Sequence, residues 1–209
     1  MIRKRLFTRL QTLAVTCCLA AALTACHSGS VAAAPDFDAD SLIVGLDDVQ
    51  RIADRDDLTS LPVQDAPTPH YESPYTPDQC HPVFGQEDAF GHNWSQFRAV
   101  TYTAAGGEIK TMSTVTQAVG IYSDDGMARA EFDRLVSAAE ACAALQAKLY
   151  NFRVNKQGPS TVALVFPGYS QSVIYHVASS VLIDVVVQGL PRSDQIAETV
   201  MQMIAGRVR

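Results

Sequence analysis

Basic residues are scarce in this sequence once its first positions are set aside. The 209-residue chain holds 16 lysines and arginines against 22 acids, a net charge of −6. Four of the bases lie within residues 3–9 and the first acid is Asp36, so the chain without residues 1–25 has 12 bases against 22 acids. Nucleic-acid binding needs clustered lysine and arginine, so this balance argues against a nucleic-acid partner.

The apolar stretch near the N-terminus is too short for a comfortable membrane span. It covers residues 10–25, fewer than the ~20 residues that a transmembrane helix needs. It follows the basic cluster and ends in small residues, an arrangement typical of a secretory signal. We therefore expect residues 1–25 to be a signal peptide and the rest of the chain to be exported.

The end of this stretch, Leu23-Thr24-Ala25-Cys26, resembles the bacterial lipobox, in which the cysteine thiol receives a diacylglycerol and becomes the new N-terminus. An ordinary secretory cleavage site beside a chance cysteine is the alternative. Position, spacing and flanking charges favour lipidation of Cys26, and two or more acyl chains such as palmitate give stable anchoring to a membrane. Residues 26–40 would then be the lipidated N-terminus and a flexible tether, and residues 41–209 the folded domain.

Cysteine is scarce too, with five in the chain. Cys17 and Cys18 fall in the signal peptide and Cys26 takes the lipid, which leaves Cys80 and Cys142. An exported chain is oxidised, so a disulfide is the default, with a redox or metal pair as the alternative. No C-x-x-C motif supports that alternative. The bridge would close a loop of about 62 residues and contribute on the order of 4 kcal/mol to stability.

Six segments have the residue content or the alternation of β-strands, and short turns between the last four favour antiparallel pairing. They are Phe97–Thr103, Thr111–Tyr122, Phe152–Lys156, Thr161–Phe166, Gln171–Val177 and Val181–Gln188. With three helices between or outside them, they predict an α+β fold. We expect a two-layer sandwich, a mainly antiparallel sheet of about five to six strands covered on one side by helices.

The three helices show apolar residues at helical spacing. The first lies within residues 42–55, and the second follows the cap Ser123-Asp124-Asp125, runs to about Leu149 and carries Cys142 on its apolar face. The third starts at an N-cap Ser193 and has Arg207 and Arg209 at its negative end. Between the first two, six prolines interrupt residues 62–95. We expect this segment to be an ordered covering loop, clamped by the disulfide against the second helix.

The order of several short segments resembles the PknH-like extracellular sensor domain found in a mycobacterial receptor kinase and in small exported lipoproteins. The matching segments are Leu42-Ile43-Val44, Val49-Gln50-Arg51-Ile52, Pro77-Asp78-Gln79-Cys80, Trp94, Val115-Thr116-Gln117-Ala118-Val119, Asp124–Ala130, Val185-Val186-Val187-Gln188-Gly189 and Ile196–Ile204. The resemblance implies a compact sheet-and-helix domain with a broad cleft thought to receive an extracellular signal. The kinase of this family carries more than one disulfide, whereas this chain has cysteines for one, and we expect it to transmit no signal across the bilayer by itself.

Three enzyme chemistries find little support. Residues 168–172 lack the closing glycine of a nucleophile elbow, and paired acids such as Asp47-Asp48 are explained by helix starts. His70, His81 and His92 share one segment, but their spacing fits no zinc pattern. We therefore predict a chain that is no enzyme, has no cofactor and has no metal site.

Two polar positions stand out among the strands. Asp184 interrupts an apolar run and shares a strand face with Leu182, Val186 and Gln188, and His176 could lie on a nearby rung. A polar outer face of a half-solvated sheet is the alternative. Aromatic side chains supply contact area in clefts. The candidate ligand-binding residues are therefore Trp94, Tyr122, Tyr169, Tyr175, His176 and Asp184, although the aromatic ones could equally belong to the core.

The sequence thus favours a non-catalytic binding or sensor domain, held by lipid on Cys26 at the outer face of the plasma membrane. Its ligand would be a small molecule from the envelope, such as a lipid or glycan fragment. The alternative is a module that docks onto another envelope protein. An enzyme with an unrecognised site is the third hypothesis, and a cluster of strongly shifted titratable groups in the cleft would favour it.

Overall fold

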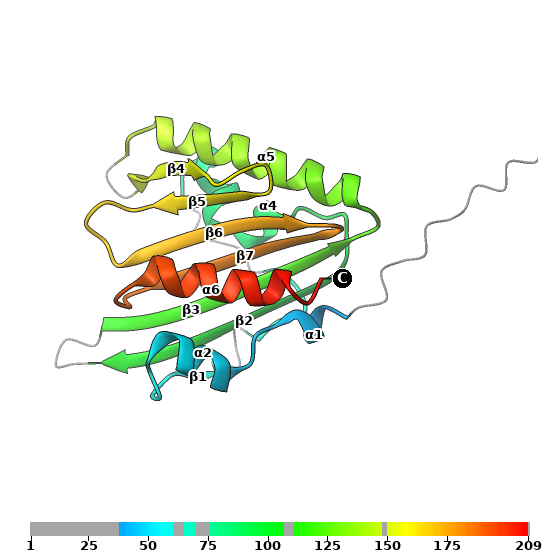
Figure 1. Ribbon diagram of the computed structural model, residues 1–209. Coiled ribbons are helices and arrows are strands. Elements are labelled where there is room, and N and C mark those ends of the chain that lie inside the picture. Colours follow the sequence, from blue (N-terminus) through cyan, green and yellow to red (C-terminus); the bar gives the residue numbers. More distant parts are fainter. Residues whose placement is uncertain (1–37, 61–64, 70–75, 107–110, 148–149, 209) are drawn as a thin grey trace, which may run out of the picture. The chain divides into compact units, whose positions relative to one another are not determined.

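The computed structural model describes residues 38–60, 65–69, 76–106, 111–147 and 150–208. Their strands form one antiparallel seven-stranded sheet in the order β1-β2-β3-β7-β6-β5-β4 (Figure 1). The strands are β1 (Thr59–Ser60), β2 (Trp94–Gly106), β3 (Thr111–Tyr122), β4 (Arg153–Lys156), β5 (Thr161–Val165), β6 (Gln171–Ala178) and β7 (Val181–Gln188). The predicted α+β class and antiparallel sheet are confirmed. The sheet exceeds the expected five to six strands because the two-residue β1 pairs with the edge of β2.

Helices pack on both faces of the sheet, so the expected two layers become three. One face carries α1 (Ala39–Leu42), α2 (Leu46–Ala53) and α6 (Ser193–Ala205). The other carries the 3-10 helix η2 (Asp78–Cys80), α3 (His81–Phe84), α4 (Gln86–Phe90) and α5 (Asp125–Ala144). In Figure 1, α6 crosses in front of the strands while α4 lies behind them.

The sequence of β7 explains why both faces are covered. Its two sets of alternating side chains are mostly apolar, and a strand that is apolar on both faces must be buried on both. Val181, Ile183, Val185 and Val187 pack in the core with α2 and α6. Leu182 packs in the second core, which lies beneath α5. Asp184 shares the face of Leu182 and is the buried polar residue of this strand, whereas Gln188 at the strand end is exposed.

The folded domain begins before the expected boundary at residue 41. Ala39 is buried, its backbone N–H donates to Gln96 Oε1 at 3.1 Å, and Asp40 pairs with Arg98. The flexible tether predicted for residues 26–40 therefore cannot include residues 39 and 40. Residues 1–37, which hold the predicted signal peptide and Cys26, lie outside the described part of the chain.

A buried amide attaches the first segment of the domain to the sheet. The side chain of Gln117 on β3 accepts from the backbone N–H of Val44 at 2.8 Å and donates to the Val44 carbonyl at 2.7 Å. The hydroxyl of Tyr102 donates to the same carbonyl at 3.0 Å. These three hydrogen bonds satisfy the backbone N–H and carbonyl of Val44, a residue that belongs to no helix or strand.

Two helix ends differ from the expectation. The predicted cap of α5 is confirmed, since Asp124 accepts from the Met127 N–H at 2.9 Å, but the helix ends at Ala144 rather than near Leu149. Ser193 is the first residue of α6 rather than its N-cap, which is Arg192 in a left-handed conformation. The guanidinium of Arg207, just after α6, donates to three carbonyls of residues 41–43 and so links this end of the helix to the first segment of the domain. Arg209 lies outside the described residues.

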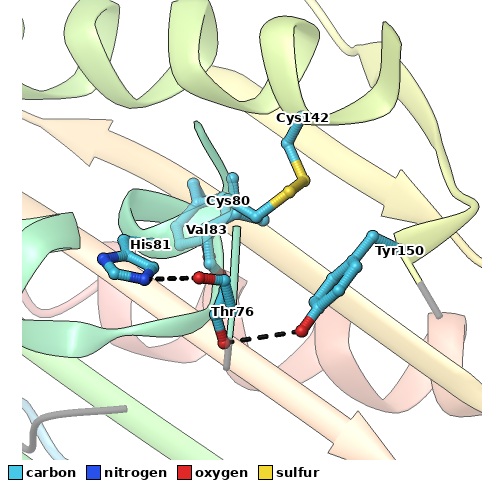
Figure 2. Close-up of a disulfide and its surroundings, with 7 residues drawn as sticks. Thr76, Cys80, His81, Val83, Cys142 and Tyr150 are labelled. Atoms are coloured by element: carbon cyan, nitrogen blue, oxygen red, sulfur yellow. Dashed lines mark hydrogen bonds between the residues drawn. A yellow bond between two sulfur atoms is a disulfide. The ribbon is translucent and has the colours of Figure 1, made fainter. Parts of the chain in front are cut away.

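The predicted disulfide joins Cys80 of η2 to Cys142 of α5 (Figure 2). Its segment is tied down as expected, yet where it is described it forms the short helices η2, α3 and α4 rather than a loop. The Nε2–H of His81 donates to the Thr76 carbonyl at 2.7 Å, and the Tyr150 hydroxyl lies 3.5 Å from Thr76 Oγ1. The bridge and these bonds hold residues 76–90, the covering segment, over one face of the sheet.

Candidate functional site

A cleft of about 560 Å³ separates the covering segment from the sheet. This volume lies within the roughly 300–1,000 Å³ that small-molecule sites occupy. One wall comes from the covering segment, and the floor comes from β2, β3, β7 and β6. The lining residues are Val83, Phe84, Gly85, Gln86, Ala89, Ala99, Thr101, Met112, Thr114, Thr116, Gln171, Val173, Tyr175, Asp184, Val186 and Gln188.

Strand register arranges the floor as three parallel rows of side chains. The first row runs Ala99, Ala118, Asp184, Tyr175. The second row runs Thr101, Thr116, Val186, Val173. The third row runs Thr103, Thr114, Gln188, Gln171. Each row crosses β2, β3, β7 and β6 in that order, so polarity changes from row to row along the cleft.

Asp184 is the ionisable group of the first row. Its side chain is only 4% exposed, and its Oδ1 has no hydrogen-bond partner among the described residues. Burial disfavours the charged carboxylate and raises its pKa from 3.8 to about 7. The residues described as lining the cleft include no lysine, arginine or histidine. The carboxyl therefore faces the cleft with no positive charge beside it.

The covering segment contributes a second unsatisfied acceptor. Gln86, the first residue of α4, lines the cleft, and its buried Oε1 has no hydrogen-bond partner among the described residues. A buried acceptor without a partner loses its hydration and gains nothing in exchange. Two such atoms in one cleft are unusual in a native protein and call for an explanation.

Tyr175 connects the floor to the covering segment. It lies directly opposite Asp184 on the neighbouring strand, and its buried hydroxyl donates to the Val83 carbonyl at 2.6 Å. This bond fixes the height of α3 above the first row. Together with the disulfide, it gives the wall of the cleft a defined position.

The second and third rows contain no ionisable side chain. Thr101 and Thr116 satisfy each other through a hydroxyl–hydroxyl bond of 2.9 Å, beside the apolar Val186 and Val173. The third row brings the amides of Gln188 and Gln171 beside Thr114. Met112, on the same face of β3, is 58% exposed. The cleft thus passes from an acidic end through an apolar middle to an amide-lined end.

The structure brings two of the six predicted ligand-binding residues together, Tyr175 and Asp184. His176 does not join them, because neighbouring strand residues point to opposite faces. It pairs with Ile183 rather than Asp184, and its Nδ1 lies 2.7 Å from Thr161 Oγ1. Burial lowers the pKa of this imidazole. His176 and Asp184 thus lie on neighbouring rungs, as expected, but their side chains point to opposite faces of the sheet and His176 does not line the cleft.

The other three aromatic candidates lie away from the cleft. Tyr122 is fully buried, and its hydroxyl donates to the Phe90 carbonyl at 2.7 Å, so it belongs to the core. Trp94 Nε1 donates to the Gly91 carbonyl at 3.0 Å, and its ring borders a separate hollow of about 430 Å³ beside α1. Tyr169 is 62% exposed in the turn after β5.

Sequence reasoning missed several lining residues. Gln86 gave no signal, because a glutamine at the start of a helix is unremarkable until tertiary structure buries it. Thr101, Thr116 and Gln188 could have been found, since strand alternation places them on one face once the order β2-β3-β7 is known. The alternative reading of Asp184 as part of a solvated outer face is wrong, because the covering segment shields it.

The described residues hold no group of three histidine, cysteine, aspartate or glutamate side chains suited to a metal. The Nε2 of His81 is hydrogen-bonded to the Thr76 carbonyl, and His70 lies outside the described residues. None of the described helices has both the length and the apolar character to cross a membrane. What the cleft offers chemically is a pair of hydrogen-bond acceptors, the ionisable Asp184 in the floor and Gln86 in the wall, beside the apolar Val173 and Val186.

The comparisons with known proteins agree with one another. The sequence model of the PknH-like extracellular domain matches residues 35–207. The fold is similar to the crystal structure of the extracellular domain of PknH from Mycobacterium tuberculosis, with a TM-score of 0.60 and 17% sequence identity. That alignment covers 81% of this chain and 93% of the other. No curated protein matches the chain.

Proposed function

The chain belongs to the PknH-like extracellular domain family, and from that premise we propose that it is a lipid-anchored binding or sensor domain of the cell envelope. Its cleft takes a small envelope-derived ligand. The observation that carries this proposal is Asp184, a buried carboxyl with an unpartnered oxygen that lines the cleft. A core that had no use for this charge would be more stable with an apolar residue at the same position.

The proposed location rests on sequence and on oxidation state. The motif ending at Cys26 supports lipid attachment after export, which would hold the domain at the outer face of the plasma membrane. The disulfide between Cys80 and Cys142 fits an oxidising compartment. Family membership adds the extracellular setting.

The proposed role is non-catalytic. General acid–base and nucleophilic catalysis use at least two cooperating groups within hydrogen-bond reach. Among the residues described as lining the cleft, Asp184 is the one carboxyl, and the hydroxyls of Thr101 and Thr116 are bonded to each other. Such a site favours holding a ligand over transforming it, and it needs no cofactor.

Native mass spectrometry of the mature chain, purified gently from its own host, tests the proposal. We expect a reproducible additional mass that denaturation releases, and its fragmentation identifies the ligand class. The same preparation of Tyr175→Ala, which loses the hydroxyl bond to Val83 and part of the cleft wall, should carry less of that mass. A chain that is bare in every preparation would refute ligand binding.

One observation favours the second candidate, a protein-interaction module. Met112 and Tyr169 are the most exposed large apolar side chains described. The Gly189 N–H donates to the Ser170 carbonyl at 2.7 Å, and Gly189 also lies against the backbone of Met112, so all of these residues meet at one end of the sheet. A bare domain that co-purifies with a defined envelope protein, and releases it when Met112→Ser and Tyr169→Ser are combined, would establish this alternative.

A further inference from the structure

The two unsatisfied acceptors of the cleft come from different layers of the molecule. Asp184 Oδ1 belongs to the sheet and Gln86 Oε1 to the covering segment, and both line the same cavity. An acceptor is satisfied by a donor, so a ligand that fits both atoms must carry at least two N–H or O–H groups at one end.

Charge narrows the class of that donor. The other residues described as lining the cleft are apolar, amide or hydroxyl residues, and the remaining titratable one is Tyr175, whose hydroxyl already bonds the Val83 carbonyl. Among the described lining residues, those of β2, β3, β6, α3 and α4 therefore supply no counter-charge for Asp184. A positively charged group from outside would fill this role, and the acidic balance of the chain beyond residue 25 attracts cations.

We propose that the cleft recognises the positively charged nitrogen group of an amphiphilic amine. The ammonium or guanidinium donates to Asp184 Oδ1 and Gln86 Oε1. This inference rests on the proposed ligand-binding function and names the chemistry of the same site. Both donor classes carry several N–H groups, whereas a single hydroxyl could satisfy only one of the two acceptors.

The next rows of the floor describe the rest of the ligand. Val173 and Val186 lie one row from Asp184, so the carbon chain attached to the nitrogen meets an apolar surface. Beyond them, Gln171 and Gln188 offer amides that suit a polar group at the other end. A cationic head, a short apolar body and a polar end therefore match the three rows in order.

Burial explains why a cation is favoured over a sugar. Desolvation raises the pKa of Asp184 to about 7, which means that the ionised carboxylate is destabilised in the empty site. A cation removes that cost by pairing with the carboxylate in a site of low dielectric, whereas a neutral polyol leaves the charge uncompensated. An amide residue at this position would have served a polyol equally well.

Three probes with one apolar body separate these possibilities: 3-phenylpropylamine, 3-phenyl-1-propanol and 3-phenylpropionate. Each is titrated into the full mature chain held in phosphatidylcholine nanodiscs, with methyl NMR of Val173, Val186 and Val83 as the readout and empty nanodiscs as the blank. At pH 8 we expect the amine to bind at the cleft methyls at least tenfold more tightly than the alcohol. The carboxylate probe should bind weakest.

Two variants assign the preference to the proposed group. Asp184→Asn keeps the shape of the side chain and should reduce the amine-to-alcohol ratio to about one. Asp133→Asn removes the same charge from the exposed face of α5 and should leave the ratio unchanged. Lowering the pH from 8 to 5 protonates Asp184 while the amine stays charged, so amine affinity should fall at least tenfold in the unmodified chain and stay flat in Asp184→Asn.

The inference is overturned if the alcohol binds the cleft as tightly as the amine, if Asp184→Asn keeps the preference, or if no probe reaches the cleft methyls. These failures are distinct from failure of the proposed function. A neutral or acidic ligand released from the host-purified chain would refute recognition of an amine but would still support the proposed ligand-binding function. A basic ligand found there would support both.

Discussion

At the scale of single residues, Asp184 shows how a buried carboxyl that lines a cleft can cost stability. The other residues of its strand up to Val187 are apolar, and Asp184 is 4% exposed. An uncompensated charge in such a position opposes folding, because the unfolded chain hydrates the carboxylate fully. The cost falls on the protein whenever the cleft is empty and the carboxyl is ionised.

This cost has a defined pH range. The pKa of Asp184 rises from 3.8 to about 7 on folding, so the folded state holds its proton more tightly than the unfolded state does. Stability from this group is therefore fully present below pH 4 and is lost as pH rises towards 7, by about 4 kcal/mol across that range. Urea unfolding at several pH values should show Asp184→Asn matching the unmodified chain near pH 4 and exceeding it above pH 7. Equal stabilities at pH 8 would contradict the assigned burial cost, and Asp133→Asn controls for the change in net charge.

Gly189 carries a second prediction at the residue scale. Its φ is +70°, and an added Cβ would lie 2.7 Å from the Met112 carbonyl oxygen, a backbone atom that cannot easily move. Gly158 has a similar φ of +89° but open space around its Cβ position. Both alanine variants incur the left-handed backbone penalty of roughly 1–2 kcal/mol, and Gly189→Ala adds the clash. Chemical denaturation should therefore find Gly189→Ala at least about 1 kcal/mol less stable than Gly158→Ala, and equal losses would refute the clash.

At the scale of elements, the disulfide decides how firmly the cleft wall is held. The covering segment consists of helices of three to five residues, which are too short to be stable alone. It depends on Cys142 of α5, on the Tyr175 hydroxyl and on buried side chains such as Phe90. Without the bridge, the wall would rely on packing and a few hydrogen bonds.

Removing the bridge should therefore loosen one part of the molecule more than the rest. In Cys80→Ala/Cys142→Ala the loop of 62 residues opens, and the free energy of unfolding should fall by about 4 kcal/mol. Hydrogen exchange of the amides of α3 and α4 should accelerate, while amides of β3 and β7 stay protected to the new global limit. Uniform acceleration across cover and sheet would contradict a local role for the bridge. Treating the double variant with reductant should change nothing further, which controls for the reagent.

Most elements could be predicted because their periodicity is local. The alternation in Val181–Gln188 and the helical spacing that ends at Cys142 each sit within one segment. The two-residue β1 could not be predicted, since its existence depends on the edge of β2. Helices cover both faces of the sheet because β7 is mostly apolar on both sides. That feature is visible in the sequence, although the prediction places helices on one side only.

The candidate site could be predicted only in part, for the same reason. Asp184 is conspicuous as an acid in an apolar strand, and Tyr175 is an aromatic on a neighbouring strand. His176 and Asp184 lie on neighbouring rungs as predicted, but whether both side chains reach one face depends on the exact register between β6 and β7, because a shift of one residue moves a side chain to the other face. Gln86 enters the site through tertiary burial alone.

At the scale of the whole molecule, the same architecture persists at 17% identity to the extracellular domain of PknH. A likeness at this identity concerns the fold alone, and a shared fold does not determine which ligand a domain binds. The ligand proposed for this chain therefore rests on its own side chains rather than on the likeness of fold.

The net charge of the chain also bears on the proposed membrane anchor. Beyond residue 25 there are 12 bases and 22 acids, so attraction to anionic lipids cannot supply a second anchoring signal. In the proposed anchor, stable attachment would depend on acyl chains at Cys26, each buried CH₂ adding about 0.8 kcal/mol. Replacing residues 1–26 by an ordinary secretory signal should move the protein from the membrane fraction to the soluble fraction. The native chain should show acyl groups on Cys26 by intact mass and stay with the membrane in high salt. The residues described as lining the cleft run from Val83 to Gln188, so the replacement leaves them unchanged and both forms should bind 3-phenylpropylamine with equal affinity. An unmodified Cys26 in the native chain, or equal membrane retention of the two forms, would refute the anchor while leaving the ligand site untouched.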